Sequence, residues 1–315
     1  MTPEPHPVLR PVADPSAEVP AFRMRGLSLG YGERAVVREV DLDIPHGATT
    51  VLIGANGCGK TTLLKGLSRQ LRPVAGTLEA DGRGVREWHA RQYARSVSLL
   101  PQSPVVPEGL TVAELVERGR HPHRRWWGAP SPDDDAAVAR AMELTELTAL
   151  AGRPVEELSG GQRQRVWIAL TLAQRARTML LDEPTSYLDL AHQVDLLDML
   201  RGLEHPEGPG AGRATVVAVL HELNLAARVA DRLVAMAAGR IVAVGTPAEV
   251  LTPGLLAEVF GLRADVARDP VGGRPVVLPR GRAREGSHPT APDAPVTLGP
   301  APRAASAAEI GRTLP

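Results

Sequence analysis

The 315-residue chain is poor in cysteine, in lysine and in aromatic side chains, and it carries no excess of charge. Its single cysteine excludes an intramolecular disulfide framework, which agrees with a reducing compartment. The formal net charge is +0, so no overall field attracts nucleic acid or an anionic membrane. No apolar run approaches the roughly 18 residues of a membrane-spanning helix, and the proline-rich start does not resemble a signal peptide. We therefore expect a cytoplasmic protein.

Lysine occurs only at positions 60 and 65, and Lys60 lies in the segment around which the chain is organised. Residues 54–62 read GANGCGKTT and contain the pattern G-x-x-x-x-G-K-[ST], between an apolar β-branched run and a helix-forming run. Glycines let the backbone N–H groups turn inward as an anion nest at a helix N-terminus. We predict a phosphate-binding loop in which Lys60 reaches the β and γ phosphates and the Thr61 hydroxyl binds Mg²⁺. A chance glycine turn is disfavoured, because the strand, loop and helix signals agree.

The predicted strands and helices follow an order typical of an α/β protein. Alternating runs over 22–44 and a punctuated stretch over 73–84 predict antiparallel strands. From 178 to 220, apolar runs of strand length alternate with helical patterns, which indicates a parallel sheet. Helical signals fill about 103–160, so we predict a helical subdomain inserted in the α/β core. The stretch 266–278 predicts a terminal hairpin.

Both ends of the chain are rich in proline and small residues. Such segments bury too little apolar surface to fold, so we expect disordered tails over 1–20 and 281–315. The remaining residues, 21–280, are expected to form the folded domain.

Two carboxylates end an apolar strand in the second half of the chain. Thr178 to Leu181 is followed by Asp182 and Glu183, so both acids are expected at the carboxyl edge of the sheet beside the phosphate loop. There Asp182 would hold Mg²⁺, and Glu183 would orient and polarise the attacking water. Acids that merely end a strand are the alternative, which the presence of the phosphate loop disfavours.

A second anion-binding element begins a helix at Leu158-Ser159-Gly160-Gly161-Gln162. Serine and glycines at a helix start expose N–H groups to an anion. One chain needs only one phosphate loop, so the second element implies two chains that face each other.

Taken together, these motifs resemble the ATP-binding cassette (ABC) ATPases, because GANGCGKTT, Gln102, LSGGQ, LLDEP, SYLD and His221 occur in the order of that family. The resemblance covers roughly residues 21–280. It implies a P-loop NTPase (RecA-like) core with an antiparallel β subdomain and an inserted α-helical subdomain. In that family two cassettes stack head to tail, and each ATP lies between one phosphate loop and the partner's LSGGQ.

The resemblance also assigns roles to individual residues. The implied ATP contacts are Tyr31, Gly54, Ala55, Asn56, Gly57, Cys58, Gly59, Lys60, Thr61 and Thr62, with Ser159, Gly160, Gly161, Gln162 and Asp189 from the partner chain. The implied catalytic residues are Glu183, His221 and Gln102, and the implied Mg²⁺ ligands are Thr61, Gln102 and Asp182. Tyr31 would stack on adenine, Gln102 would also sense the membrane subunit, Asp189 would join the two sites and His221 would bond the γ-phosphate. Taken one at a time, Tyr31 could be a packed aromatic, Gln102 a loop amide and Asp189 a helix cap. His221 could be a histidine whose hydrogen bonds are satisfied at a strand end.

Several segments resemble importers for ferric siderophores, haem and vitamin B12. They are residues 110–123, 157–168, 185–193, 221–224 and 261–275, of which the last resembles the siderophore branch. The implied function is that of the ATPase subunit of an importer, peripheral on the cytoplasmic face of the cell membrane. It would act on a transmembrane permease and, indirectly, with an extracytoplasmic substrate-binding protein. Haem or vitamin B12 import is the alternative. A soluble cassette acting on ribosomes or DNA is disfavoured by the single cassette.

Three features of the sequence allow more than one interpretation. Cys58 stands where the family commonly has serine, and we weigh simple steric tolerance against an oxidation-sensitive ATPase. The pair Trp126-Trp127 either packs in the core or docks a permease helix. His121 and His123 flank a proline, and two ligands do not make a metal site.

Overall fold

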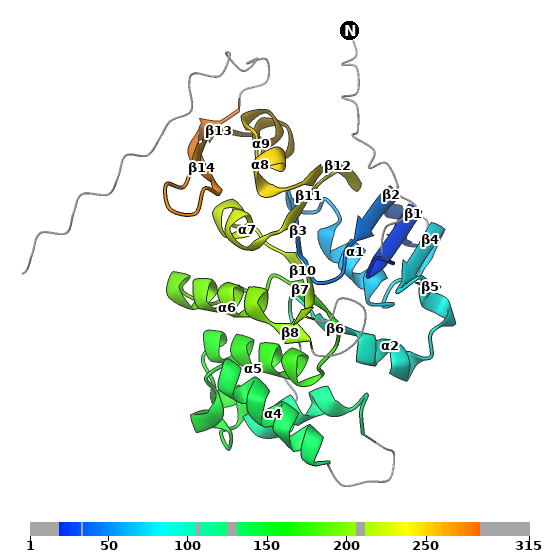
Figure 1. Ribbon diagram of the computed structural model, residues 1–315, viewed down its shortest axis with the longest axis vertical. Helices are drawn as coiled ribbons and strands as arrows, with labels where there is room; N and C mark the ends of the chain where they lie inside the picture. The colour runs from blue at the N-terminus through cyan, green and yellow to red at the C-terminus, as the bar shows by residue number, and fades with distance from the viewer. Residues whose placement is uncertain (1–18, 33, 105–107, 125–130, 206–211, 284–315) are drawn as a thin grey trace, which may run out of the picture.

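A six-stranded sheet forms the centre of the molecule (Figure 1). The computed structural model describes residues 19–32, 34–104, 108–124, 131–205 and 212–283. The sheet order is β12-β11-β3-β10-β7-β6, parallel except for β12, which pairs antiparallel with β11. The strands are β3 (Thr49–Gly54), β6 (Val97–Leu100), β7 (Thr178–Asp182), β10 (Thr215–Val219), β11 (Arg232–Ala237) and β12 (Arg240–Gly245).

Strands β3, β7 and β10 are buried at every residue, which explains why they read as continuous apolar runs. Leu52 points into one core together with Leu63 of helix α1 (Lys60–Leu67). Its neighbours Val51 and Ile53 point into a second core, on the opposite face. Helices of that second core include α6 (Leu190–Gly202), α7 (Leu223–Val229), α8 (Pro247–Val250) and α9 (Pro253–Phe260).

A four-stranded antiparallel sheet packs on α1, as the patterns over 22–44 and 73–84 predicted. Its order is β2-β1-β4-β5, and its strands are β1 (Phe22–Tyr31), β2 (Arg34–Ile44), β4 (Pro73–Ala80) and β5 (Arg83–Gly84). The approach is close, because a Cβ added to Gly66 of α1 would lie 2.4 Å from Leu29 Cδ1 of β1. The α/β fold class with an antiparallel β subdomain is confirmed.

The inserted helical unit is larger than predicted. It contains α3 (Val112–Glu117) and α4 (Pro132–Leu144), and Val166 and Ala169 of α5 (Gly160–Ala173) lie in the same core. The predicted end near residue 160 is therefore early, since α5 completes this unit.

Buried Arg120 ties the helical unit together. Its side chain is 2% exposed and donates to Asp134 Oδ1 (2.8 Å), to the Ala173 carbonyl (3.0 Å) and to Asp133 Oδ2 (3.1 Å). Burial opposes ionisation of Asp134, but the N–H of Ser131 and the Arg120 guanidinium hold the pKa of Asp134 below its usual range.

The remaining elements close the fold. They are α2 (Ala90–Ser96), the hairpin β13 (Leu262–Arg268) and β14 (Pro275–Arg282), the short pair β8 (Glu204–His205) and β9 (Gly212–Arg213), and the 3₁₀ turns Val85–Glu87, Arg118–Arg120, Thr148–Leu150 and Val155–Glu157. The terminal hairpin is longer than predicted, and it includes Gly281 and Arg282, so the boundary placed at 281 is too early. Within the described ranges, no helix has the length and apolarity needed to cross a membrane. Trp126-Trp127 and most of both predicted tails lie outside those ranges.

Candidate nucleotide-hydrolysis site

The predicted site residues follow the carboxyl ends of four neighbouring strands. The loop after β3 leads to Lys60, the first residue of α1. The next three strands in the sheet, β10, β7 and β6, lead to His221, Glu183 and Gln102. Parallel strands bring their carboxyl ends to one edge of a sheet, so residues distant in sequence meet there. Along this edge of the sheet, the phosphate loop is followed by His221, then by the carboxylates of Asp182 and Glu183, and then by the amide of Gln102.

The loop from Gly54 to Gly59 needs glycine for steric reasons. Gly54 has φ 150°, and an added Cβ would lie 2.2 Å from the Met236 carbonyl oxygen. Gly57 and Gly59 also have positive φ, of 76° and 110°. The Lys60 ammonium donates to the carbonyls of Gly54 (2.8 Å) and Ala55 (3.0 Å) and is 5% exposed. A single buried cation thus lies within the loop at the start of α1.

Two oxygen ligands suited to Mg²⁺ meet beside the loop. The Thr61 hydroxyl donates to Asp182 Oδ1 over 3.1 Å, and Asp182 is 3% exposed. Burial raises the pKa of Asp182, while the bond from Thr61 works in the opposite direction. A hydroxyl and a carboxylate are ligands that Mg²⁺ prefers, and a cation here would offset the cost of burying the charge.

Glu183 is the centre of a hydrogen-bonded network. Its Oε1 accepts from Gln102 Nε2 over 2.7 Å and lies 2.6 Å from His221 Nε2, and its Oε2 accepts from the Ser186 hydroxyl over 3.4 Å. Because an ionised carboxylate only accepts, His221 bears its proton on Nε2 in this arrangement. Glu183 itself has φ 54°, a conformation that non-glycine residues rarely adopt and that is concentrated at functional sites.

These groups surround a cavity of about 550 Å³. It is lined by Val36, Asn56, Gly57, Gly59, Lys60, Thr61, Thr62, Gln102, Glu183 and His221. Val36 was not predicted, since nothing in the alternating pattern of β2 distinguishes it. Tyr31 does not line the cavity. It is 51% exposed at the end of β1, where Lys65 Nζ lies 5.8 Å from its ring centroid.

The residues predicted to act from a partner lie elsewhere on the chain. Among the described residues that line the cavity, none comes from 159–162. Ser159 caps α5, and the added Cβ of Gly160 would touch Tyr187 at 3.5 Å. Asp189 caps α6 and accepts from the His192 backbone N–H over 3.0 Å. Tyr187 is 77% exposed beside these helix starts.

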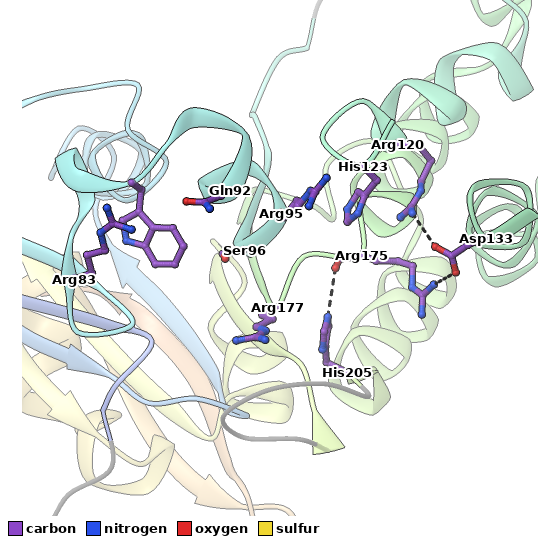
Figure 2. Close-up of a pocket in the computed structure, with 11 residues that line it drawn as sticks. Arg83, Gln92, Arg95, Ser96, Arg120, His123, Asp133, Arg175, Arg177 and His205 are labelled. Atoms are coloured by element: carbon purple, nitrogen blue, oxygen red, sulfur yellow. Dashed lines mark hydrogen bonds and ion pairs between the residues drawn. The ribbon is translucent and has the colours of Figure 1, made fainter. Parts of the chain in front are cut away.

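A larger cavity, of about 840 Å³, lies outside this network between α2 and the helical unit (Figure 2). It is lined by Arg83, Trp88, Gln92, Arg95, Ser96, Arg120, His123, Asp133, Arg175, Arg177 and His205. Asp133 is engaged by both Arg120 (3.1 Å) and Arg175 (2.8 Å), and His123 Nε2 lies 2.8 Å from the Gln174 carbonyl. No predicted site residue lines this larger cavity, so its greater volume does not make it the hydrolysis site.

A phosphate loop, strand-end carboxylates and an inserted helical unit define a nucleotide-hydrolysing cassette. Residues 37–186 match the family described as ABC transporter, and the chain belongs to that family, as an ATP-binding ATPase subunit.

Curated relatives and solved structures agree with this assignment. The chain is 46% identical to the ferric enterobactin transport ATP-binding protein FepC of Escherichia coli, over 82% of this chain and 95% of FepC. It is 44% identical to the petrobactin import ATP-binding protein FpuD of Bacillus anthracis (84% and 95%) and 42% identical to the hemin import ATP-binding protein HmuV of Rhodococcus jostii (86% and 89%).

Two solved structures share the fold. One is a transporter described as of the metal-chelate type, in an inward-facing conformation, with TM-score 0.68 and 29% identity over 82% of this chain and 97% of the other. The other is a dimeric structure of the bacterial ABC transporter cassette MJ0796, with TM-score 0.62 and 25% identity over 71% and 98%.

Proposed function

We propose that the chain energises import of a ferric siderophore through a membrane permease, at the cytoplasmic face of the membrane. The observation that carries this proposal is the 46% identity with FepC across 82% of the chain. An extracytoplasmic substrate-binding protein would deliver the substrate to the permease. Haem import is the second candidate, because HmuV is 42% identical over 86% of the chain.

The ATPase unit, over about 21–280, is proposed to act as a head-to-tail dimer. Ser159 and Asp189 each cap a helix at a surface outside the cavity of their own chain. A two-fold axis would bring the start of α5 from one chain over the phosphate loop of the other. The dimeric MJ0796 cassette supports this arrangement. ATP then shifts the equilibrium toward closure, because it contacts both chains only in the closed state.

In the closed site, Lys60 and the loop N–H groups would bind the β and γ phosphates. Thr61, Asp182 and Gln102 would hold Mg²⁺, which offsets charge on the phosphates. The water oxygen bonds to the γ-phosphorus as Glu183 accepts its proton, and the bond from the γ-phosphorus to the bridging oxygen breaks, which leaves that oxygen on ADP beside Lys60. His221 Nε2–H donates to a γ-phosphate oxygen. His221 Nε2 bonds to Glu183 in this structure, so it must release Glu183 to reach a γ-phosphate oxygen. Gln102 donates to Glu183 from Nε2, which leaves its amide oxygen available to Mg²⁺.

Uptake assays test the import assignment. A deletion strain should lose uptake of radiolabelled ferric siderophore, and the wild-type gene should restore it while Glu183→Gln should not. If the deletion abolished uptake of labelled haem and spared the siderophore, the second candidate would replace the first. For the dimer, the specific rate of ATP hydrolysis should rise with protein concentration. A rate independent of concentration, in a protein that sediments as a monomer, would contradict the shared site.

A further inference from the structure

His221 is held in place by little besides its neighbours in the chain. Its ring meets Glu183 at 2.6 Å, the one side-chain bond of His221 within the described part of the chain. It stands between β10, which is fixed in the sheet, and α7. A helix of seven residues such as α7 is marginal by itself, so its orientation depends on what packs against it.

The terminal hairpin bonds to the first turn of α7 through Asn224. The Asn224 side chain donates from Nδ2 to the Val277 carbonyl (3.2 Å) and accepts at Oδ1 from the Val277 N–H (2.7 Å). The Asn224 amide thus bonds both the N–H and the carbonyl of Val277, as a neighbouring strand would in a sheet. Figure 1 shows the hairpin beside α7.

The same hairpin also binds the other end of α7. Arg274 Nη1 donates to the carbonyls of Ala227 (2.8 Å) and Ala230 (2.9 Å). The last carbonyls of a helix lack partners within it and carry the negative end of its dipole, so a guanidinium is favourable there. Asn224 and Arg274 together bond α7 at both ends.

The turn between β13 and β14 is built to present Arg274. Asp269 accepts at its two carboxylate oxygens from the N–H groups of Val271 (3.1 Å) and Gly272 (2.9 Å). Its backbone N–H donates to the Arg274 carbonyl (2.8 Å), and Gly273 takes φ 66°. This accounts in physical terms for the Asp269 to Pro275 segment, which the hydrolysis site itself does not use.

We propose that Asn224 and Arg274 are positioning residues for ATP hydrolysis, which act through α7 to fix the imidazole of His221. The proposal rests on the proposed role of His221 at the γ-phosphate. Neither residue lines the cavity, so their removal should affect the orientation of His221 and spare nucleotide binding.

The test compares full-length Asn224→Ala and Arg274→Ala with Arg280→Ala, all assayed as dimers. Arg280 belongs to the same hairpin but pairs with Asp265 (2.6 Å), so its replacement controls for loss of an arginine. We expect kcat to fall about 10- to 100-fold in the two test variants, because a displacement of about 1 Å carries that penalty. KM for ATP should stay within about twofold. Arg274→Lys, which keeps a cationic donor, should recover most of the loss.

Hydrogen exchange gives a readout that is independent of turnover. Amides of α7 should exchange faster in Arg274→Ala and Asn224→Ala than in Arg280→Ala. Normal kcat in both test variants, beside an impaired His221→Ala, would overturn the positioning role and leave the proposed function intact. An equal loss of kcat in Arg280→Ala would also overturn it. Normal turnover in His221→Ala would instead refute the role of the histidine on which the proposal rests.

Discussion

Replacing Glu183 by glutamine removes one charge and keeps the size of the side chain. The new amide oxygen can still accept from His221, whose Nε2 lies 2.6 Å from Glu183 Oε1. The amide nitrogen, however, has no lone pair to accept a proton from water. Since ATP should be held by Lys60 and the loop, which do not change, we expect binding to persist while hydrolysis fails.

The size of this loss follows from the role of a general base, which contributes about 10²- to 10⁴-fold, or about 2.7–5.5 kcal/mol of transition-state stabilisation. The assay is phosphate release under saturating ATP, with sedimentation to detect a closed dimer that keeps its nucleotide. Glu222→Gln is a matched control, because Glu222 carries the same charge, neighbours His221 and does not line the cavity. Turnover of Glu183→Gln within about threefold of the wild type would refute the assignment of this carboxylate.

Three further predictions concern binding, stability and the thiol. Lys60→Ala should weaken ATP binding about 10- to 100-fold, as expected for one charge-assisted hydrogen bond, and unchanged affinity by titration calorimetry would contradict it. Asp134→Asn should destabilise the fold by about 3 kcal/mol at pH 7, because the buried Arg120 guanidinium then lacks the opposite charge beside it, and exposed Asp135→Asn should not. Because the pKa of Asp134 is lowered on folding, its contribution to the free energy of unfolding is complete above about pH 5 and is lost as the pH falls below its ordinary pKa of 3.8. The stabilities of the wild type and Asp134→Asn should therefore converge in acid. Cys58 is 5% exposed, 3.7 Å from Lys60 Nζ. We expect the Cys58 thiol to react slowly with an alkylating reagent and the alkylated protein to lose ATP binding. Cys58→Ser should keep turnover. An enzyme that stays active after complete alkylation would rule out redox sensitivity.

The central sheet was predictable from the sequence because its signals are local. Strands buried on both faces read as apolar runs, and glycine and proline mark their ends. The same runs placed Asp182 and Glu183 at the carboxyl edge, where Asp182 accepts a bond from Thr61 and Glu183 lines the cavity.

Other features depend on contacts between residues far apart in the chain. Asn224 and Val277 are 53 positions apart, and no local pattern pairs them. Val36 faces the cavity because of how β2 lies against the loop, which alternation alone does not define. The predicted helical unit ended near residue 160, but Val166 and Ala169 of α5 pack in the core of α3 and α4, while Ile168 of the same helix packs in the core of the central sheet.

The two ends of α5 are held by different groups. At the last turn, the Ala173 carbonyl is bound by buried Arg120. At the first turn, Ser159 faces the surface and is satisfied by its own capping box with Gln162. Fourteen helical residues span about 21 Å, so the buried end at Ala173 and the exposed start at Ser159 lie far apart on one rigid element. In the proposed dimer that start faces the partner, so substitutions around Arg120 should alter how the protomers engage without changing any residue that lines the cavity.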